Sequence, residues 1–333
     1  MLAARRRARQ RGGRRGRRDL RGREGRLSNI RRARLAPRLY SGATHVTRNA
    51  AVLTRLLPFT FALLWASSYA AAKVGLADIT PFAFVALRLA LAALAAGAIL
   101  LMRSAAWDAV LRSWPHLLIG GTLVHGLALA TTHAALVSVG AAPTALVHAL
   151  HPILTAALGV LLLGESFRLR QWIGVIFGFC GVLIAVPLAA GSGALGLLVA
   201  SLVGLSGGTL YLKRFCADVP PFEATAVQLV GGALLAGFMA LTLETPHAHW
   251  TASLIAAMAW NTVLMSIGGM ALYNFILVHY GAARAASSFF VVPGAAALIA
   301  WLVLGESLSP LTLIGLAAAT LGVALVWWRP AQR

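Results

Sequence analysis

Acidic residues are scarce in this chain of 333 residues. It has nine Asp and Glu against 29 Lys and Arg, and charged residues of both signs make up only 11% of the sequence, whereas 59% of the residues are hydrophobic. The mean hydropathy is +0.80. A water-soluble globule of this size needs far more polar side chains to cover its surface, so the composition excludes that class and predicts a protein of the lipid bilayer.

Cysteines are few, and the common catalytic motifs are missing. Cys180 lies in an apolar run and Cys216 in a predicted loop, so the two lie at different predicted depths and do not indicate a disulfide framework. The sequence has no phosphate-binding loop, no His-Glu-x-x-His, no Gly-x-Ser-x-Gly and no pair of Asp at membrane depth. We therefore predict no catalytic residue, no metal, no cofactor and no ATPase subunit.

The net charge of +20 comes mainly from residues 1–55, which hold 18 of the 29 Lys and Arg. This segment shows no helical or strand periodicity, and we expect a disordered cytoplasmic tail. Three interpretations compete: an arm for nucleic acid or anionic lipid, a tail that sets the membrane topology, and a stretch upstream of the true start codon. The bias toward Arg, Gly and Ala favours the last, with translation starting near residues 51–53, and we expect no nucleic-acid partner.

One phrase occurs twice. Leu-Gly-Glu-Ser closes an apolar run at residues 163–166 and another at residues 304–307, a spacing of 141. The same spacing matches further positions, and a spacing of 140 extends the match upstream; the pairs include Gly174 and Gly315, Gly181 and Gly322, Lys73 and Lys213, and Gly97 and Gly237. The chain therefore consists of two related halves.

The repeated phrase has the residue types of a turn between helices. Gly164 and Gly305 suit a helix end that needs a left-handed residue. Glu165 and Glu306 suit the start of the following helix. We interpret these four residues as structural and not as chemistry.

The remainder of the chain divides into apolar segments of the length that a bilayer requires. A hydrocarbon core of about 30 Å needs about 20 apolar residues in a helix. The runs are long, do not alternate and are rich in Leu and Ala, which favours helices over a membrane barrel. We place ten spans, at Leu56–Val74, Pro81–Met102, His116–Val137, Pro143–Leu163, Gln171–Leu188, Gly193–Tyr211, Pro221–Leu243, Leu254–Val278, Ala283–Leu304 and Leu311–Trp328.

The loop charges predict the orientation of these spans. With both termini in the cytoplasm, nearly all Lys and Arg of the loops fall on the cytoplasmic side. Each half, residues 56–188 and 193–328, then has five spans, and residues 329–333 form a short cytoplasmic tail. Because five is odd, the second half enters the membrane from the opposite side. Inverted repeats of this kind predict alternating access to a site between the halves.

The sequence resembles the EamA family of the drug/metabolite transporter superfamily. The resemblance rests on Trp65-Ala66-Ser67-Ser68-Tyr69, on Lys73-Val74-Gly75-Leu76, on residues 81–88 and on both copies of Leu-Gly-Glu-Ser, and it covers residues 56–328. It implies a ten-helix carrier of the bacterial inner membrane, with a central cavity lined by the first four spans of each half. Relatives in this family export amino acids and other small metabolites or move nucleotide sugars.

A charged residue in a membrane helix is the first candidate for substrate binding. Arg88 lies about two turns into the second predicted span, where a charge costs about 2.5 to 3.5 kcal/mol unless it faces protein or water. It either receives an anionic group of the substrate or pairs with a backbone carbonyl or with Asp78. Lys73, by contrast, lies at a helix end, where snorkelling to the interface is the simpler interpretation.

Several uncharged polar residues complete the predicted cavity. His148 and His151 lie on one helical face, and without a nearby deep carboxylate or thiolate they favour cavity lining or proton coupling over a metal site. Each of the other candidates is common in packing or at the membrane interface, but together they indicate a cavity with aromatic walls and few charges; they are Tyr69, His133, Tyr273 and Asn274.

These observations favour a secondary transporter or facilitator that exports a small polar metabolite such as an amino acid. Its partners are the lipid bilayer and that metabolite, and the sequence leaves the oligomeric state open. A flippase or a non-transporting scaffold of the same fold is the alternative, and an intramembrane enzyme is a weaker one because the required motifs are missing.

Overall fold

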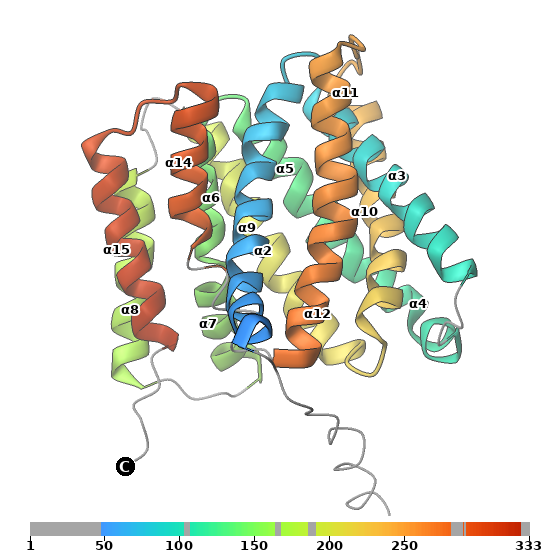
Figure 1. Cartoon of the computed structure of the whole chain (residues 1–333), viewed down its shortest axis with the longest axis horizontal. Helices are drawn as coiled ribbons and strands as arrows, with labels where there is room; N and C mark the ends of the chain where they lie inside the picture. The colour runs from blue at the N-terminus through green and yellow to red at the C-terminus, as the bar shows by residue number, and fades with distance from the viewer. Residues whose placement is uncertain are drawn as a thin grey trace, which may run out of the picture. The chain divides into compact units, whose positions relative to one another are not determined.

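The structure of the chain is a computed structural model, which describes residues 48–102, 107–163, 168–185, 191–280, 289 and 291–327. The chain forms two units, Met1–Arg55 and Leu56–Arg333, and the architecture below is that of the second. Its described residues form helices (Figure 1), with one isolated β-bridge between Ile79 and Ala248. The all-helical fold that the apolar runs predict is confirmed.

The helices follow one another through short connections. Their bounds are α2 (Arg48–Gly75), α3 (Pro81–Leu101), α4 (Trp107–Gly121), η1 (Thr122–Leu127), α5 (Ala128–Leu136), α6 (Ala141–Ala149), α7 (His151–Leu163), α8 (Leu169–Ala185), α9 (Gly191–Phe215), α10 (Pro221–Leu243), α11 (Ala252–Ala259), η3 (Trp260–Gly269), α12 (Met270–Tyr280), α14 (Val292–Leu304) and α15 (Pro310–Trp327).

Six helical stretches in the described part of the chain are long and apolar enough to cross a bilayer. They are Pro81–Leu101, Trp107–Leu136, Ala141–Leu161, Gly191–Phe215, Pro221–Leu243 and Ala252–Tyr273. Shorter apolar helices cover Leu169–Ala185, Val292–Leu304 and Pro310–Leu325. The count of ten spans stays a prediction.

Some boundaries differ from those predicted. The first helix begins at Arg48, inside the segment predicted as a disordered tail, because residues 50–53 are helix-compatible Ala, Val and Leu. The helix of the third predicted span begins at Trp107, well before His116, and it contains Pro115 without a break. The helix that carries His148 ends at Ala149 with its C-cap at Leu150, and α7 begins at His151, which leaves Pro152 in the first turn of α7, where its missing N–H needs no partner.

Each half contains a π-helical segment, and the two lie at equivalent positions of the repeat. The segment η1 covers residues 122–127, and the repeat spacing of 141 maps it onto residues 263–268, which lie inside η3. In η3 the hydroxyl of Ser266 donates to the carbonyl oxygen of Asn261, 3.0 Å away and five residues back. Such segments are rare and are frequent at functional sites. The halves therefore share an irregularity that the apolar sequence did not predict.

Glycines let α8 and α15 approach each other closely. A Cβ atom added at Gly181 would lie 2.6 Å from the carbonyl oxygen of Gly315, and one added at Gly322 would lie 2.6 Å from that of Gly174. The repeat spacing maps Gly174 onto Gly315 and Gly181 onto Gly322, so each contact is the repeat-related copy of the other. The two helices run side by side (Figure 1), and the last helices of the two halves pack with internal symmetry.

Candidate functional site

A cavity of about 270 Å³ lies among the helices of both halves. Its lining comes from α2, α3, η1, α5, α6 and the first residue of α7 in the first half and from α9, α10, η3, α12 and α14 in the second, together with Phe289. Among the described residues, α8 and α15 contribute nothing to this lining. The cavity therefore lies where the resemblance implied, away from the symmetric pair of last helices.

Residues that the repeat equates line this one cavity from both sides. The pairs are Trp65 and Leu205, Tyr69 and Thr209, Leu89 and Leu229, Val124 and Met265, His125 and Ser266, Leu129 and Met270, Thr132 and Tyr273, His148 and Phe289, and His151 and Val292. The two members of a pair differ in chemistry in most cases. Within the described lining, the arginine and every histidine belong to the first half, while the second half supplies hydroxyls and apolar groups. One wall is thus polar and basic, and the other is largely apolar.

Arg88 contributes a guanidinium to the described lining of this cavity. The residue is 5% exposed, and its Nε donates to the hydroxyl of Ser266, 3.1 Å away. This hydrogen bond joins the first half of the chain to the second. Among the described residues that line the cavity, none carries a carboxylate. Asp78, the partner considered from the sequence, instead accepts from the hydroxyls of Thr251 and Ser253. The guanidinium thus contributes a positive charge to a cavity in which the described lining holds no acid.

His148 is held by hydroxyl groups on both sides of its ring. The Tyr69 hydroxyl lies 2.7 Å from Nδ1, and Ser201 and Thr132 lie 2.6 and 3.0 Å from Nε2. The Tyr69 hydroxyl in turn accepts from Nε1 of Trp65 at 3.1 Å. Both ring nitrogens therefore have protein partners, and this network fixes the ring in the cavity wall.

His133 differs from His148 in having a ring nitrogen without a partner. Its Nδ1 lies 2.7 Å from the carbonyl oxygen of Leu129, which only accepts, so Nδ1 carries the hydrogen. In the neutral ring Nε2 is then an acceptor, and it is buried without a hydrogen-bond partner among the described residues. The ring stacks on Phe84 with centroids 5.5 Å apart. A buried acceptor beside a cavity is unusual, because such groups are normally satisfied.

The other predicted site residues take different positions. Nδ1 of His151 lies 3.2 Å from the hydroxyls of both Ser206 and Thr155. Tyr273 lines the cavity and packs in an aromatic cluster with Phe61 and Phe289, at centroid distances of 5.2 and 5.9 Å. Asn274 belongs to α12, but its side chain lies outside the described residues.

The second copy of the repeated phrase does more than form a turn. Gly305 has φ +65°, the left-handed conformation predicted for it. Glu306, however, does not cap the helix that follows, because the hydroxyl of Ser309 accepts from the N–H of Thr312 there. Gly164 and Glu165 lie outside the described residues.

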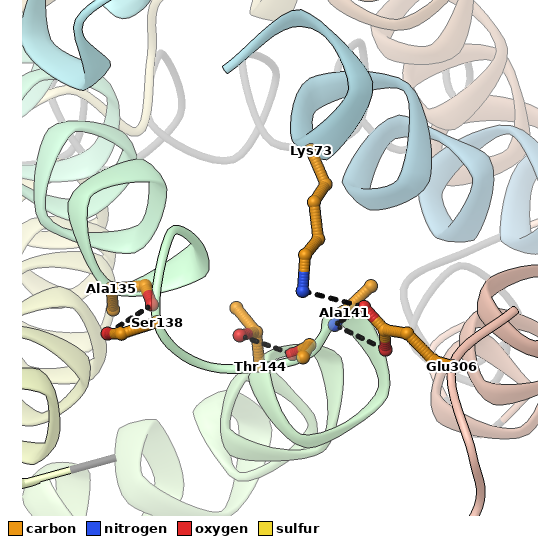
Figure 2. Close-up of polar contacts among 7 residues, drawn as sticks. Lys73, Ala135, Ser138, Ala141, Thr144 and Glu306 are labelled. Carbon is orange, nitrogen blue, oxygen red and sulfur yellow. Dashed lines mark hydrogen bonds and ion pairs between the residues drawn. The ribbon is translucent and has the colours of Figure 1, made fainter. Parts of the chain in front are cut away.

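Glu306 instead pairs with Lys73 (Figure 2). The two charged groups, Nζ and Oε1, are 2.8 Å apart, and the carboxylate also accepts from the N–H of Ala141 at the start of α6. Lys73 therefore does not snorkel alone, because a partner from the other half lies within reach. The charge-assisted hydrogen bond to Glu306 gives the Lys73 ammonium group part of the stabilisation that water would provide at the membrane interface.

The sequence model of the EamA-like transporter family matches residues 53–186 and again residues 191–328. The chain belongs to the EamA-like transporter family. The resemblance found in the sequence is thereby confirmed, and with its apolar helices this EamA-like transporter is a multi-pass membrane protein.

Relatives of this EamA-like transporter are known by sequence and by structure. The chain is 29% identical over 293 residues to the uncharacterized transporter YvbV of Bacillus subtilis, an alignment that covers 82% of this chain and 91% of that protein. It is 25% identical over 195 residues to the uncharacterized transporter YyaM of the same organism, covering 54% of this chain and 62% of that protein. A crystal structure of a protein 22% identical has a TM-score of 0.59, with 82% of this chain and 96% of that chain covered, and shares the fold.

Several residues that hold the cavity side chains were not singled out from the sequence. Ser266 holds Arg88, and Thr132 and Ser201 hold His148. Serine and threonine occur throughout apolar helices, so their presence alone gave no signal. Ser266 occupies the position that the repeat equates with His125, which also lines the cavity.

Proposed function

We propose that this EamA-like protein is a secondary transporter of the bacterial inner membrane that exports small organic acids such as amino acids. The observation that carries the proposal is Arg88, a buried cation that lines the cavity and is held by Ser266 of the other half. A buried charge in a membrane protein is costly and marks a functional site by default. A guanidinium offers five donors in a planar fork that matches a carboxylate, so the carboxylate of the substrate is its natural partner.

The Nε2 atom of His133, an acceptor without a partner among the described residues, limits which organic acids suit the cavity. With Nδ1 bound to Leu129, Nε2 can accept a hydrogen from a substrate but cannot donate one while the ring is neutral. A group next to the carboxylate that donates, such as an α-amino or an α-hydroxyl group, would satisfy it. His148 and His151, which the sequence suggested for cavity lining or proton coupling, already have hydroxyl partners. The largely apolar wall of the second half would receive the remainder of the molecule.

Alternating access of two inverted halves is the mechanism that we propose. It is supported by the repeat-related pairs around one cavity and by the symmetric contacts of α8 and α15. In this topology the end of α2 with Lys73 and the connection after α14 with Glu306 face outward and both termini face the cytoplasm, in agreement with the loop charges. The sequence has no phosphate-binding loop, so the driving energy would come from a gradient.

Counterflow in proteoliposomes tests the proposed function. Vesicles containing the purified protein are loaded with an unlabelled amino or hydroxy acid, and the uptake of labelled acid is followed. Saturable uptake that requires internal substrate supports the proposal. An absence of exchange with any α-amino or α-hydroxy acid contradicts it and favours the flippase or scaffold alternatives.

A comparison of paired substrates tests the role of His133. We expect an α-hydroxy acid to compete in counterflow about tenfold more strongly than the same acid without its hydroxyl, because the latter leaves Nε2 unsatisfied, at a cost of about 1 to 3 kcal/mol. In His133→Phe, which keeps an aromatic ring beside Phe84, this preference should disappear. His148→Phe is the matched control, and it should retain the preference. Equal loss of preference in both variants would contradict the assignment.

A further inference from the structure

The ion pair between Lys73 and Glu306 joins three separate elements of the chain. Lys73 belongs to the last turn of α2, Glu306 to the connection between α14 and α15, and the Ala141 N–H to the first turn of α6. The N–H lies 3.1 and 3.0 Å from the two carboxylate oxygens, so both oxygens of Glu306 are engaged. Figure 2 shows the lysine side chain reaching from its helix to this carboxylate.

The local sequence is suited to this contact. A Cβ atom added at Gly140 would lie 2.7 Å from Oε2 of Glu306, so glycine leaves room for the carboxylate at the helix N-terminus. The side chains of Lys73 and Glu306 are 30% and 17% exposed, so that the pair is only partly screened by solvent. A carboxylate at a helix N-terminus is further favoured by the helix dipole.

The pair lies just beyond one end of the cavity lining on α2 and α6. Ala72, next to Lys73, lines the cavity, and so does Ala145, one turn into α6 from Ala141. Lys73 and Ala141 belong to the first family match and Glu306 to the second. The contact therefore ties the two halves together where the cavity ends.

We propose that Lys73, Glu306 and the N-terminus of α6 form a latch that holds this end of the cavity closed and opens once in each transport cycle. The inference rests on the proposed alternating access. A latch must be strong enough to bias the closed state and weak enough to break. A charge-assisted contact meets both needs, because it is formed by a few polar atoms and leaves no apolar surface to be pulled apart.

Glu244 provides a matched control at the same kind of site. Its carboxylate accepts from the N–H groups of Phe82 and Ala83, at 3.3 and 2.8 Å, and so caps the start of α3 from the end of α10. In the described part of the chain it has no ion pair, whereas Glu306 does. The helices α3 and α10 also pack along their length, so this cap is not the contact that joins them. Replacing Glu244 therefore removes a helix cap without removing an ion pair between the two halves.

Cysteine accessibility tests the latch without requiring a substrate. The reporter is Ala145→Cys in a full-length background carrying Cys180→Ala and Cys216→Ala, with Ala72→Cys as a second reporter on α2. A membrane-impermeant maleimide is applied to intact cells and, separately, to inside-out vesicles. In the otherwise unchanged protein we expect slow labelling from the side on which Glu306 lies.

Removing the ion pair should open that end. We expect Glu306→Gln to accelerate labelling of the reporter from that side about tenfold to a hundredfold, the range expected for the loss of a hydrogen bond to a charged group. Glutamine keeps an oxygen that accepts from Ala141, so the effect reports the charge. Lys73→Met should have the same effect, and the double variant no more than either single one.

Three results would overturn the latch. Labelling rates unchanged in both Glu306→Gln and Lys73→Met would exclude it, as would equal acceleration in Glu244→Gln or additive effects in the double variant. Purified variants that elute as the parent protein does establish that the fold is intact. Accelerated labelling together with no counterflow of any acid would keep the latch and reject only the proposed substrate.

Discussion

Replacing Arg88 with glutamine is expected to reduce counterflow of small carboxylates about a hundredfold or more. The truncation of one partner in a buried, hydrogen-bonded charge pair costs about 2 to 5 kcal/mol, and about 2.8 kcal/mol corresponds to a hundredfold change in binding. Glutamine suits the site because Gln228 occupies the repeat-related position and is itself buried. The variant should therefore fold, and initial rates of counterflow over a range of substrate concentrations measure the loss.

Arg88→Lys separates charge from geometry in the same assay. Lysine keeps the positive charge but lacks the planar fork that binds a carboxylate with two parallel hydrogen bonds. We expect activity between those of the parent and of Arg88→Gln. Gln228→Ala serves as a control for disturbance at a buried polar position, and it should leave most of the activity. Full activity of Arg88→Gln would show that the substrate anion is bound elsewhere.

Gly181→Ala and Gly322→Ala are expected to destabilise the fold by similar amounts. In both variants the new methyl group would lie 2.6 Å from a carbonyl oxygen of the facing helix, so α8 and α15 must move apart. Overpacking of this kind costs about 1 to 3 kcal/mol. The apparent melting temperature of the purified protein, followed by the loss of monodisperse protein on heating, should fall by several degrees in each case.

Gly237→Ala is the control for the glycine substitutions. It lies in α10, and an added Cβ atom there would meet nothing within 4 Å. Alanine is favoured over glycine within a helix by about 1 kcal/mol, so this variant should be as stable as the parent or more so. If Gly181→Ala lowered the melting temperature and Gly322→Ala did not, the equivalence of the two contacts would fail.

The sequence was sufficient for the parts of the fold that depend on composition and repetition. Long apolar runs without alternation predict membrane helices, because a helix satisfies all of its backbone hydrogen bonds within the segment. The repeated phrase at residues 163–166 and 304–307 revealed two halves. The cost of a charge in a membrane helix likewise makes Arg88 a candidate on its position in the chain alone. These inferences use only the identity of residues near one another in the chain.

Other features depend on contacts that no local pattern encodes. The ion pair joins Lys73 to a residue 233 positions away, and the hydroxyl groups around His148 come from three different helices. The π-helical segments η1 and η3 consist of residues common in any apolar helix. The wider π-helical turn therefore cannot be recognised from the hydropathy of the sequence. The acceptor of His133 becomes apparent only when its other nitrogen is placed against a carbonyl group.

The unequal walls of the cavity have a consequence for how such a carrier changes over generations. The basic groups of the described lining come from the first copy of an ancestral duplication, and the apolar groups facing them come largely from the second. Under the proposed function, substitutions such as the one that distinguishes Phe289 from His148 would change how the body of a solute is accommodated and leave the binding of its charge at Arg88 intact. In the proposed transporter the duplication would thus separate two binding tasks, which a symmetric dimer of identical subunits would have to meet with one set of residues.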